Sequence, residues 1–153
     1  MKLSPNVAAN PFSPAVKGRP KKLTRGIEEM PAAPHAARSA VILFVDDDPL
    51  IAMSTTEMLE DLGHRVIGVN SGLHALDIIR SEQPIDLMMT DHVMPGMTGV
   101  ELAAATRQVR PSLPILLATG YADLPEGSQL DLPRLAKPYH QEQLRDRLDQ
   151  LLG

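Results

Sequence analysis

Three consecutive carboxylates, Asp46, Asp47 and Asp48, directly follow the first long apolar run of the sequence, and Asp91 follows a later one. Carboxylates packed this closely repel one another, and a hard cation among them keeps them ionised. Mg²⁺ takes oxygen ligands of this kind. If these side chains converge, the sequence predicts a magnesium site in which one carboxylate can act as a nucleophile.

A hydroxyl and an ammonium group extend this set towards phosphoryl transfer. Thr119 ends another apolar run, and Lys137 follows the short segment 134–136. The hydroxyl could donate a hydrogen bond to a phosphoryl oxygen, and the lysine together with Mg²⁺ would neutralise the phosphoryl charge. Phosphoryl transfer depends mainly on positioning and charge stabilisation, and these residues supply both.

Each of these residues also has an ordinary structural interpretation. Asp48 precedes Pro49 and is better explained as a helix cap than as a ligand. Thr119 could belong to a turn, Asp91 could begin a loop, and Lys137 could lie on the surface. A shared site is favoured because it explains why all of them follow apolar runs.

The elements that must position these residues follow a strand–helix alternation. Continuous apolar runs are typical of strands buried on both faces of a parallel sheet. Helical patterns separate the runs, so we expect βαβ units and a doubly wound α/β fold. Ligands bind beyond the carboxyl ends of the strands in such sheets, where the polar residues lie. The expected strands are 41–45, 66–69, 87–89, 115–118 and 134–136.

Helix-capping residues and apolar spacing predict four helices. One spans about 49–62, one starts after Ser71, one starts near Thr98, and the last lies near the C-terminus. We expect Gly63 to end the first helix. Four methionines are expected to pack in the core: Met53, Met58, Met88 and Met89. The residues expected on the buried faces are Ile51, Thr55, Met58, Leu59 and Leu62, then Leu73, Leu76 and Ile79, then Val100, Ala103, Ala104 and Val109, and finally Leu144, Leu148 and Leu151.

The charge and proline distributions divide the chain into two parts. Residues 1–38 hold six of the fourteen prolines, seven basic and two acidic side chains, and no apolar period. We expect this part to be a disordered, basic tail. Residues 39–153 hold eight basic and seventeen acidic side chains, a net charge of −9, and are expected to form one domain.

Composition excludes several classes of protein. With 153 residues and no Cys, the chain can form no disulfide and no cysteine metal site. The absence of Trp and the acidic domain make nucleic acid an unexpected partner. No apolar run approaches the ~20 residues of a membrane span, and no secretory signal is evident. We therefore expect a soluble, cytoplasmic protein that does not bind membranes.

Residues from about 40 to 152 resemble the receiver domain of two-component response regulators. The resemblance covers the whole expected domain in order and implies a five-stranded, flavodoxin-like fold. The motifs that carry it are Val45-Asp46-Asp47-Asp48-Pro49, Asp86-Leu87-Met88-Met89-Thr90-Asp91-His92-Val93-Met94-Pro95-Gly96-Met97-Thr98-Gly99, Ala118-Thr119-Gly120-Tyr121 and Lys137-Pro138.

The resemblance implies a role for each site residue by its motif position. Asp91 would accept the phosphoryl group, Thr119 would be the switch hydroxyl, and Lys137 would contact the phosphoryl group. His92 is expected to be an exposed loop residue that supplies its carbonyl rather than a general base. The implied Mg²⁺ ligands are Asp47 directly, Asp46 largely through water, Asp91, and the backbone carbonyl of His92.

The resemblance also implies partners and a signalling role. A histidine kinase or histidine phosphotransferase would donate the phosphoryl group, and the domain would act as a phosphorelay switch through protein–protein contacts. It would assist its own phosphorylation and dephosphorylation without being a metabolic enzyme. A monomer or weak homodimer is expected.

Three features depart from, or refine, the family pattern. Arg134 stands three residues before Lys137, where receivers usually carry the switch Tyr or Phe. This combination is similar to receivers that stand alone or end hybrid histidine kinases. Pro125 and Gly127 fall between Thr119 and Lys137, so a short or irregular fourth helix is expected there. Val93 cannot orient a water molecule by hydrogen bonding, which predicts slow self-dephosphorylation.

Two other functions compete with the phosphorylated receiver. Asp46-x-Asp48, Thr119 and Lys137 fit the outline of a haloacid-dehalogenase-type phosphatase, but that interpretation leaves Asp91 unexplained. A receiver that docks to partners without phosphorylation is the other alternative. The complete set of acids, hydroxyl and lysine argues against it.

Overall fold

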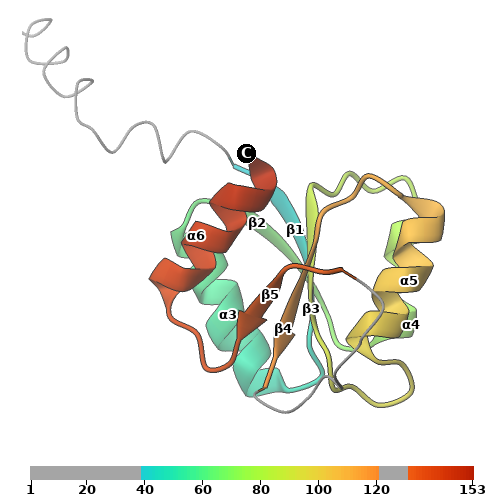
Figure 1. Cartoon of the computed structure of the whole chain (residues 1–153), viewed down its shortest axis with the longest axis horizontal. Helices are drawn as coiled ribbons and strands as arrows, with labels where there is room; N and C mark the ends of the chain where they lie inside the picture. The colour runs from blue at the N-terminus through green and yellow to red at the C-terminus, as the bar shows by residue number, and fades with distance from the viewer. Residues whose placement is uncertain (1–38, 121–130) are drawn as a thin grey trace, which may run out of the picture. The chain divides into compact units, whose positions relative to one another are not determined.

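A five-stranded parallel sheet covered by helices on both faces forms the domain (Figure 1). The structure is a computed structural model, and it describes residues 39–120 and 131–153. Strands and helices alternate as the sequence predicts. In chain order, the elements are β1 (Val41–Val45), α3 (Pro49–Asp61), β2 (Arg65–Val69), α4 (Gly72–Arg80), β3 (Leu87–Asp91), α5 (Gly99–Val109), β4 (Ile115–Thr119), β5 (Arg134–Ala136) and α6 (Gln141–Leu152).

The strand order β2-β1-β3-β4-β5 places a topological switch beside β1. The chain goes from β1 outward to β2, then returns to the other side of β1 and continues outward through β3, β4 and β5. Val45 pairs with Thr90, so the ends of β1 and β3 lie side by side. Crossovers that leave in opposite directions open a crevice at this point of the sheet edge. Asp46 and Asp91 lie there.

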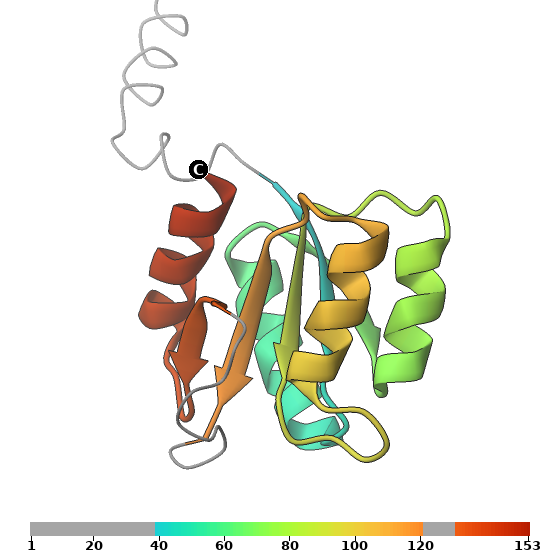
Figure 2. The same ribbon diagram turned by 45° about the vertical axis from the view of Figure 1, so that its right-hand side comes forward.

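The residues of each strand alternate between two apolar layers. In β1, Leu43 and Val45 belong to the core that α4 and α5 complete, whereas Ile42 and Phe44 belong to the core on the side of α3 and α6. Figure 2 shows the two helix pairs on opposite faces of the sheet. Because both faces are covered, the central strands are apolar on both sides, as the continuous runs predicted.

Polar caps fix where three of the helices begin. Asp48 accepts hydrogen bonds from the N–H groups of Leu50 and Ile51, so its interpretation as the N-cap of α3 is confirmed. Ser71 caps α4, and Thr98 forms a capping box with Glu101 at the start of α5. The first helix ends one residue earlier than predicted, and Gly63 follows with a φ of +98°.

Two of the predicted helix faces are wrong in part. Leu73 and Val109 are exposed, and so is Ala104. The buried stripe of α4 begins at Gly72 and that of α5 at Gly99, and each continues at the third, fourth and seventh residue after the glycine. A glycine lets a helix approach its neighbour closely, so the stripe is rotated away from the face that apolar side chains indicated. The residues missed on α5 are Leu102 and Thr106.

Of the other residues predicted to be buried, some are buried and some are exposed. Met88 and Met89 are fully buried, but Met53 is 58% exposed on the outer side of α3. Leu144 and Leu148 are fully buried in α6 as predicted.

The expected irregular fourth helix falls on residues 121–130, which lie outside the described residues. In the part of the chain that the structure describes, no helix has the length and apolar character needed to cross a bilayer.

Candidate functional site

Three carboxylates meet at the carboxyl edge of the sheet. One oxygen each from Asp46, Asp47 and Asp91 lies within 4.8 Å of the others. Asp46 and Asp47 follow β1, and Asp91 is the last residue of β3, so the switch in strand order brings them together. Asp46 and Asp91 are buried, whereas Asp47 is exposed and leaves the cluster open to solvent.

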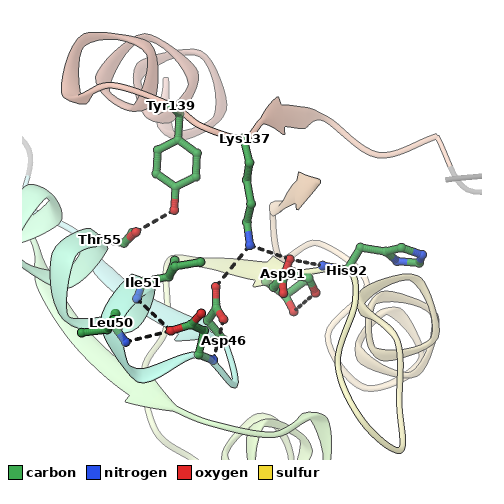
Figure 3. Close-up of polar contacts among 10 residues, drawn as sticks. Asp46, Leu50, Ile51, Thr55, Asp91, His92, Lys137 and Tyr139 are labelled. Carbon is green, nitrogen blue, oxygen red and sulfur yellow. Dashed lines mark hydrogen bonds and ion pairs between the residues drawn. The ribbon is translucent and has the colours of Figure 1, made fainter. Parts of the chain in front are cut away.

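Asp91 is held by donors on one of its two carboxylate oxygens. Lys137 Nζ lies 2.9 Å from Asp91 Oδ1, and the backbone N–H of His92 donates to the same oxygen at 2.9 Å. Figure 3 shows the lysine reaching Asp91 from the segment after β5. Oδ2 has no donor among the described residues, so this oxygen remains available for chemistry.

Asp46 is a buried carboxylate with an incomplete set of partners. Its Oδ1 accepts a hydrogen bond from the Asp48 N–H at 2.9 Å, and its Oδ2 lies 3.5 Å from Lys137 Nζ. Oδ2 makes no hydrogen bond within the described part of the chain. Burial raises the pKa of Asp46; the Asp48 N–H and Lys137 oppose that rise, and the charges of Asp91 and Asp47 add to it.

The excess of negative charge at this site fits the binding of a divalent cation. Three carboxylates share a single lysine, and one buried oxygen lacks a hydrogen bond within the described structure. Mg²⁺ is bound by one or a few carboxylates and keeps several waters, which the exposed side at Asp47 allows. The residues that could hold it are Asp46, Asp47 and Asp91.

Lys137 brings a positively charged ammonium group into the site. Its side chain is 21% exposed and bridges Asp46 and Asp91. Burial alone would lower the pKa of Lys137, but the hydrogen bond to Asp91 and the charges of both aspartates outweigh it, and the pKa is raised. The lysine therefore stays charged at neutral pH. Its backbone N–H donates to the Thr119 carbonyl at 2.8 Å, which ties it to the end of β4.

Thr119 lies at the same edge, as predicted. It is the last residue of β4, is 7% exposed, and pairs with Ala136, the residue before Lys137. Its neighbour Ala118 pairs with Asp91. The sheet register therefore places Thr119 on the strand next to Asp91, at the same edge of the sheet.

The predicted exposure of His92 is wrong, whereas the role of its carbonyl as a metal ligand stays a prediction. The residue is buried, not exposed, and its Nδ1 has no hydrogen-bond partner among the described residues. Its carbonyl accepts the Gly99 N–H at 2.8 Å, so this oxygen already has a donor before any metal binds. In Figure 3 the imidazole points away from Lys137. The loop folds back towards the start of α5, which buries the ring and directs the carbonyl to Gly99.

Gly99 contributes to the site by having no side chain. A Cβ at this position would clash with the Asp91 carbonyl oxygen and would lie 2.7 Å from Leu117 Cδ1 and 2.9 Å from His92 Cα. The start of α5 can pack against the backbone of the β3 end only with glycine here. The sequence motif contained Gly99, but nothing in its spacing indicated this packing.

The sequence did not predict one polar pair next to the site. Thr55 was expected on the buried face of α3 as a packing residue, yet its hydroxyl lies 2.6 Å from the hydroxyl of Tyr139, two residues after Lys137. A threonine on an otherwise apolar face was the available signal, because buried hydroxyls need partners. The partner itself could not be found without the fold.

Comparisons with known proteins agree with this arrangement. Response regulator receiver protein CpdR of Brucella abortus is 33% identical over 115 residues, which cover 72% of this chain and 95% of that protein. Sporulation initiation phosphotransferase F of Bacillus subtilis is 31% identical over 115 residues, with 72% and 92% covered. The response regulator TrrA of Thermotoga maritima, solved in complex with Mg²⁺-BeF, superposes with a TM-score of 0.68 at 29% identity over 74% of this chain and 99% of that chain.

A family model for the response regulator receiver domain matches residues 42–149. The match spans β1 to α6 and includes every residue of the carboxylate cluster as well as Thr119 and Lys137. The fold, the site at the sheet edge and the relatives all point to the same group of proteins. The chain belongs to the response regulator receiver family, whose members act as phosphorelay switches in two-component signalling.

Proposed function

We propose that Asp91 is the residue that receives the phosphoryl group. The single observation that carries this proposal is the environment of Asp91, a buried carboxylate with one oxygen held by Lys137 and His92 and the other without a donor in the described structure. A nucleophile needs such orientation, and a lysine at 2.9 Å is placed to balance charge on an attached phosphoryl group.

The phosphoryl group would come from a phosphohistidine of a histidine kinase or histidine phosphotransferase. An oxygen of Asp91 attacks phosphorus, the new O–P bond forms as the P–N bond breaks, and the leaving imidazole keeps the electron pair and takes up a proton. One relative is named a phosphotransferase, which supports transfer between proteins. We also propose that the domain works as a monomer or weak homodimer in the cytoplasm and has no metabolic substrate.

Asp46, Asp47, Asp91 and the backbone carbonyl of His92 would hold Mg²⁺. When bound, the metal would supply positive charge for the phosphoryl oxygens and relieve the repulsion among the carboxylates. The similar receiver TrrA was solved in complex with Mg²⁺-BeF, which supports this assignment. Lys137 and the Thr119 hydroxyl would contact the remaining phosphoryl oxygens. Their placement at the ends of β5 and β4 supports these roles.

Incubation with acetyl phosphate tests the proposal. In the presence of Mg²⁺, the intact wild-type protein should gain the mass of one phosphoryl group, and the Asp91→Asn variant should gain none. Chelation of the metal beforehand should prevent the gain. A wild-type protein that folds but gains no mass would favour a docking module that is not phosphorylated.

A further inference from the structure

Two buried hydroxyls that the proposed chemistry does not use connect α3 with the segment after β5. Thr55 Oγ1 and Tyr139 Oη are 2.6 Å apart, and the two residues are 2% and 8% exposed. Each is the partner of the other, although 84 positions separate them in the chain. A buried hydroxyl is costly when unpaired, so this contact fixes the distance between the two segments.

The two segments joined by this contact carry opposite sides of the site. Tyr139 follows Lys137 by two residues, and Thr55 lies about two turns into α3, the helix capped by Asp48 directly after the acidic pair. Figure 3 shows Tyr139 and Lys137 descending from the same segment, one towards Thr55 and the other towards Asp91. The hydroxyl contact therefore lies between the chain that supplies the lysine and the chain that supplies Asp46.

Without this contact, hydrogen bonds on either side of residues 138–140 still hold the chain: the Lys137 N–H donates to the Thr119 carbonyl of β4, and Gln141 Nε2 donates to the Met58 carbonyl of α3 at 3.3 Å. A cavity of about 500 Å³, lined by Leu50, Ser54 and Pro138 among others, lies between α3 and the segment around Tyr139. This space leaves room for residues 137–139 to shift between those two hydrogen bonds. A shift of the Lys137 backbone would change the distances from its ammonium group to Asp46 and Asp91 unless the side chain adopted another conformation.

We propose that the Thr55–Tyr139 hydrogen bond is a positioning contact that holds the Lys137 ammonium group between Asp46 and Asp91 for phosphoryl transfer. This inference rests on the proposed function of Asp91 and Lys137. Neither hydroxyl touches the reacting groups, so both residues act through Lys137. Small displacements of a charged group cost rate because phosphoryl transfer depends on positioning.

Three variants separate positioning from stability. Tyr139→Phe and Thr55→Val each leave one buried hydroxyl unpaired, and each should lower the melting temperature. The double variant replaces both hydroxyls with apolar groups of similar shape, so it should regain most of the stability. The contact is absent in all three. If it positions Lys137, phosphorylation by acetyl phosphate should be roughly three- to tenfold slower in all three, the double variant included.

Matched controls exclude a general effect on folding. Thr55→Ser keeps the hydroxyl, so this variant should be phosphorylated at the wild-type rate. Thr106→Val removes another buried threonine hydroxyl, whose contact is Met88 Sδ at 3.8 Å on the opposite face of the sheet, and should leave the rate unchanged. In a Lys137→Ala background, Tyr139→Phe should have no further effect on rate, because the lysine on which it acts is gone.

The outcomes distinguish this inference from the proposed function. If wild type is phosphorylated and the double variant is as fast as wild type, the positioning role is wrong. An equal loss of rate from Tyr139→Phe with and without Lys137 would also overturn it. A wild-type protein that takes up no phosphoryl group contradicts the function of Asp91 itself.

Discussion

At the scale of single residues, the site contains more negative charge than it can neutralise. Asp46 is buried beside two other aspartates and shares Lys137 with Asp91. Its raised pKa shows that burial outweighs the favourable contacts with the Asp48 N–H and Lys137. Such a group is kept at a cost to the fold, and binding of the proposed cation would offset that cost.

Asp46→Asn should therefore stabilise the metal-free protein at neutral pH. A carboxyl whose pKa is higher in the folded than in the unfolded state binds more protons when folded, so stability falls as pH rises through that range. The gain from the substitution should be present at pH 7 and disappear as the pH falls towards the ordinary pKa of aspartate. Thermal unfolding at several pH values, with a chelator present, measures it.

Added Mg²⁺ supplies the control for this prediction. The metal should raise the melting temperature of the wild type and have a smaller effect on Asp46→Asn, because ligand binding to the folded state stabilises it. A wild-type protein that is less stable than Asp46→Asn at pH 4 but not at pH 7 would contradict the assigned direction of the pKa shift.

Val93 gives a second prediction at this scale. It follows Asp91 by two residues and is 59% exposed, so it lies at the surface near the proposed phosphorylation site. Val93→Asn would introduce a side chain that can orient water by hydrogen bonding, and we expect severalfold faster loss of phosphate. Decay of phosphorylated protein, followed by intact mass, provides the test; an unchanged half-life would disprove the role of Val93.

At the scale of elements, helix packing sets the position of the carboxyl end of β3. α5 begins with Gly99, which lies against the backbone of Asp91 and His92. The Gly99 N–H also donates to the His92 carbonyl. The end of β3 is therefore shaped by its contact with α5 as well as by its pairing with β1 and β4.

Gly99→Ala should destabilise the domain by about 1–3 kcal/mol and slow phosphorylation, because the added methyl group must displace backbone atoms beside Asp91. Gly68→Ala is the matched control, since a Cβ there would meet no atom within 4 Å. Chemical denaturation measures the first effect and acetyl phosphate the second. Equal stabilities for the two variants would argue against the close approach of α5.

Most of the elements could be predicted from the sequence because their signals are local. The apolar runs identified four strands, the short segment 134–136 gave the fifth, and Asp48, Ser71 and Thr98 identified three helix starts. The buried stripes of α4 and α5 could not be read correctly. They depend on Gly72 and Gly99 meeting particular neighbours, and a glycine gives no apolar signal.

The site was predictable in a similar way. The rule that ligands bind at the carboxyl edge of a parallel sheet located Asp46, Asp47, Asp91 and Lys137 together before the strand order was known. The burial of His92 and the Thr55–Tyr139 contact were not predictable. Both depend on how a loop or a distant segment folds back onto a helix, which no local pattern records.

At the scale of the whole molecule, the described core is contained within one part of the chain. Both apolar layers consist of residues between Ala40 and Leu152. The site residues lie within the same range. The predicted division into a disordered tail, residues 1–38, and a domain, residues 39–153, stays a proposal, because residues 1–38 lie outside the described residues.

A variant that begins at residue 39 should therefore fold and be phosphorylated as fast as the full chain. Its melting temperature should match that of the full chain, because every residue that the described structure places in the two layers is kept. Circular dichroism and the acetyl phosphate assay on both chains test this. A truncated chain that unfolds at a much lower temperature, or that is phosphorylated more slowly, would show that residues 1–38 contribute to the domain.

The most direct test of the proposed function is to identify the residue that carries the phosphoryl group. Borohydride converts an aspartyl phosphate into homoserine, and peptide sequencing by mass spectrometry then locates it. After phosphorylation with Mg²⁺, we predict homoserine at position 91 and at no other aspartate. Homoserine at position 46 would instead support the phosphatase alternative, in which Asp46 is the nucleophile, and would contradict the assignment of Asp91 as the phosphoacceptor.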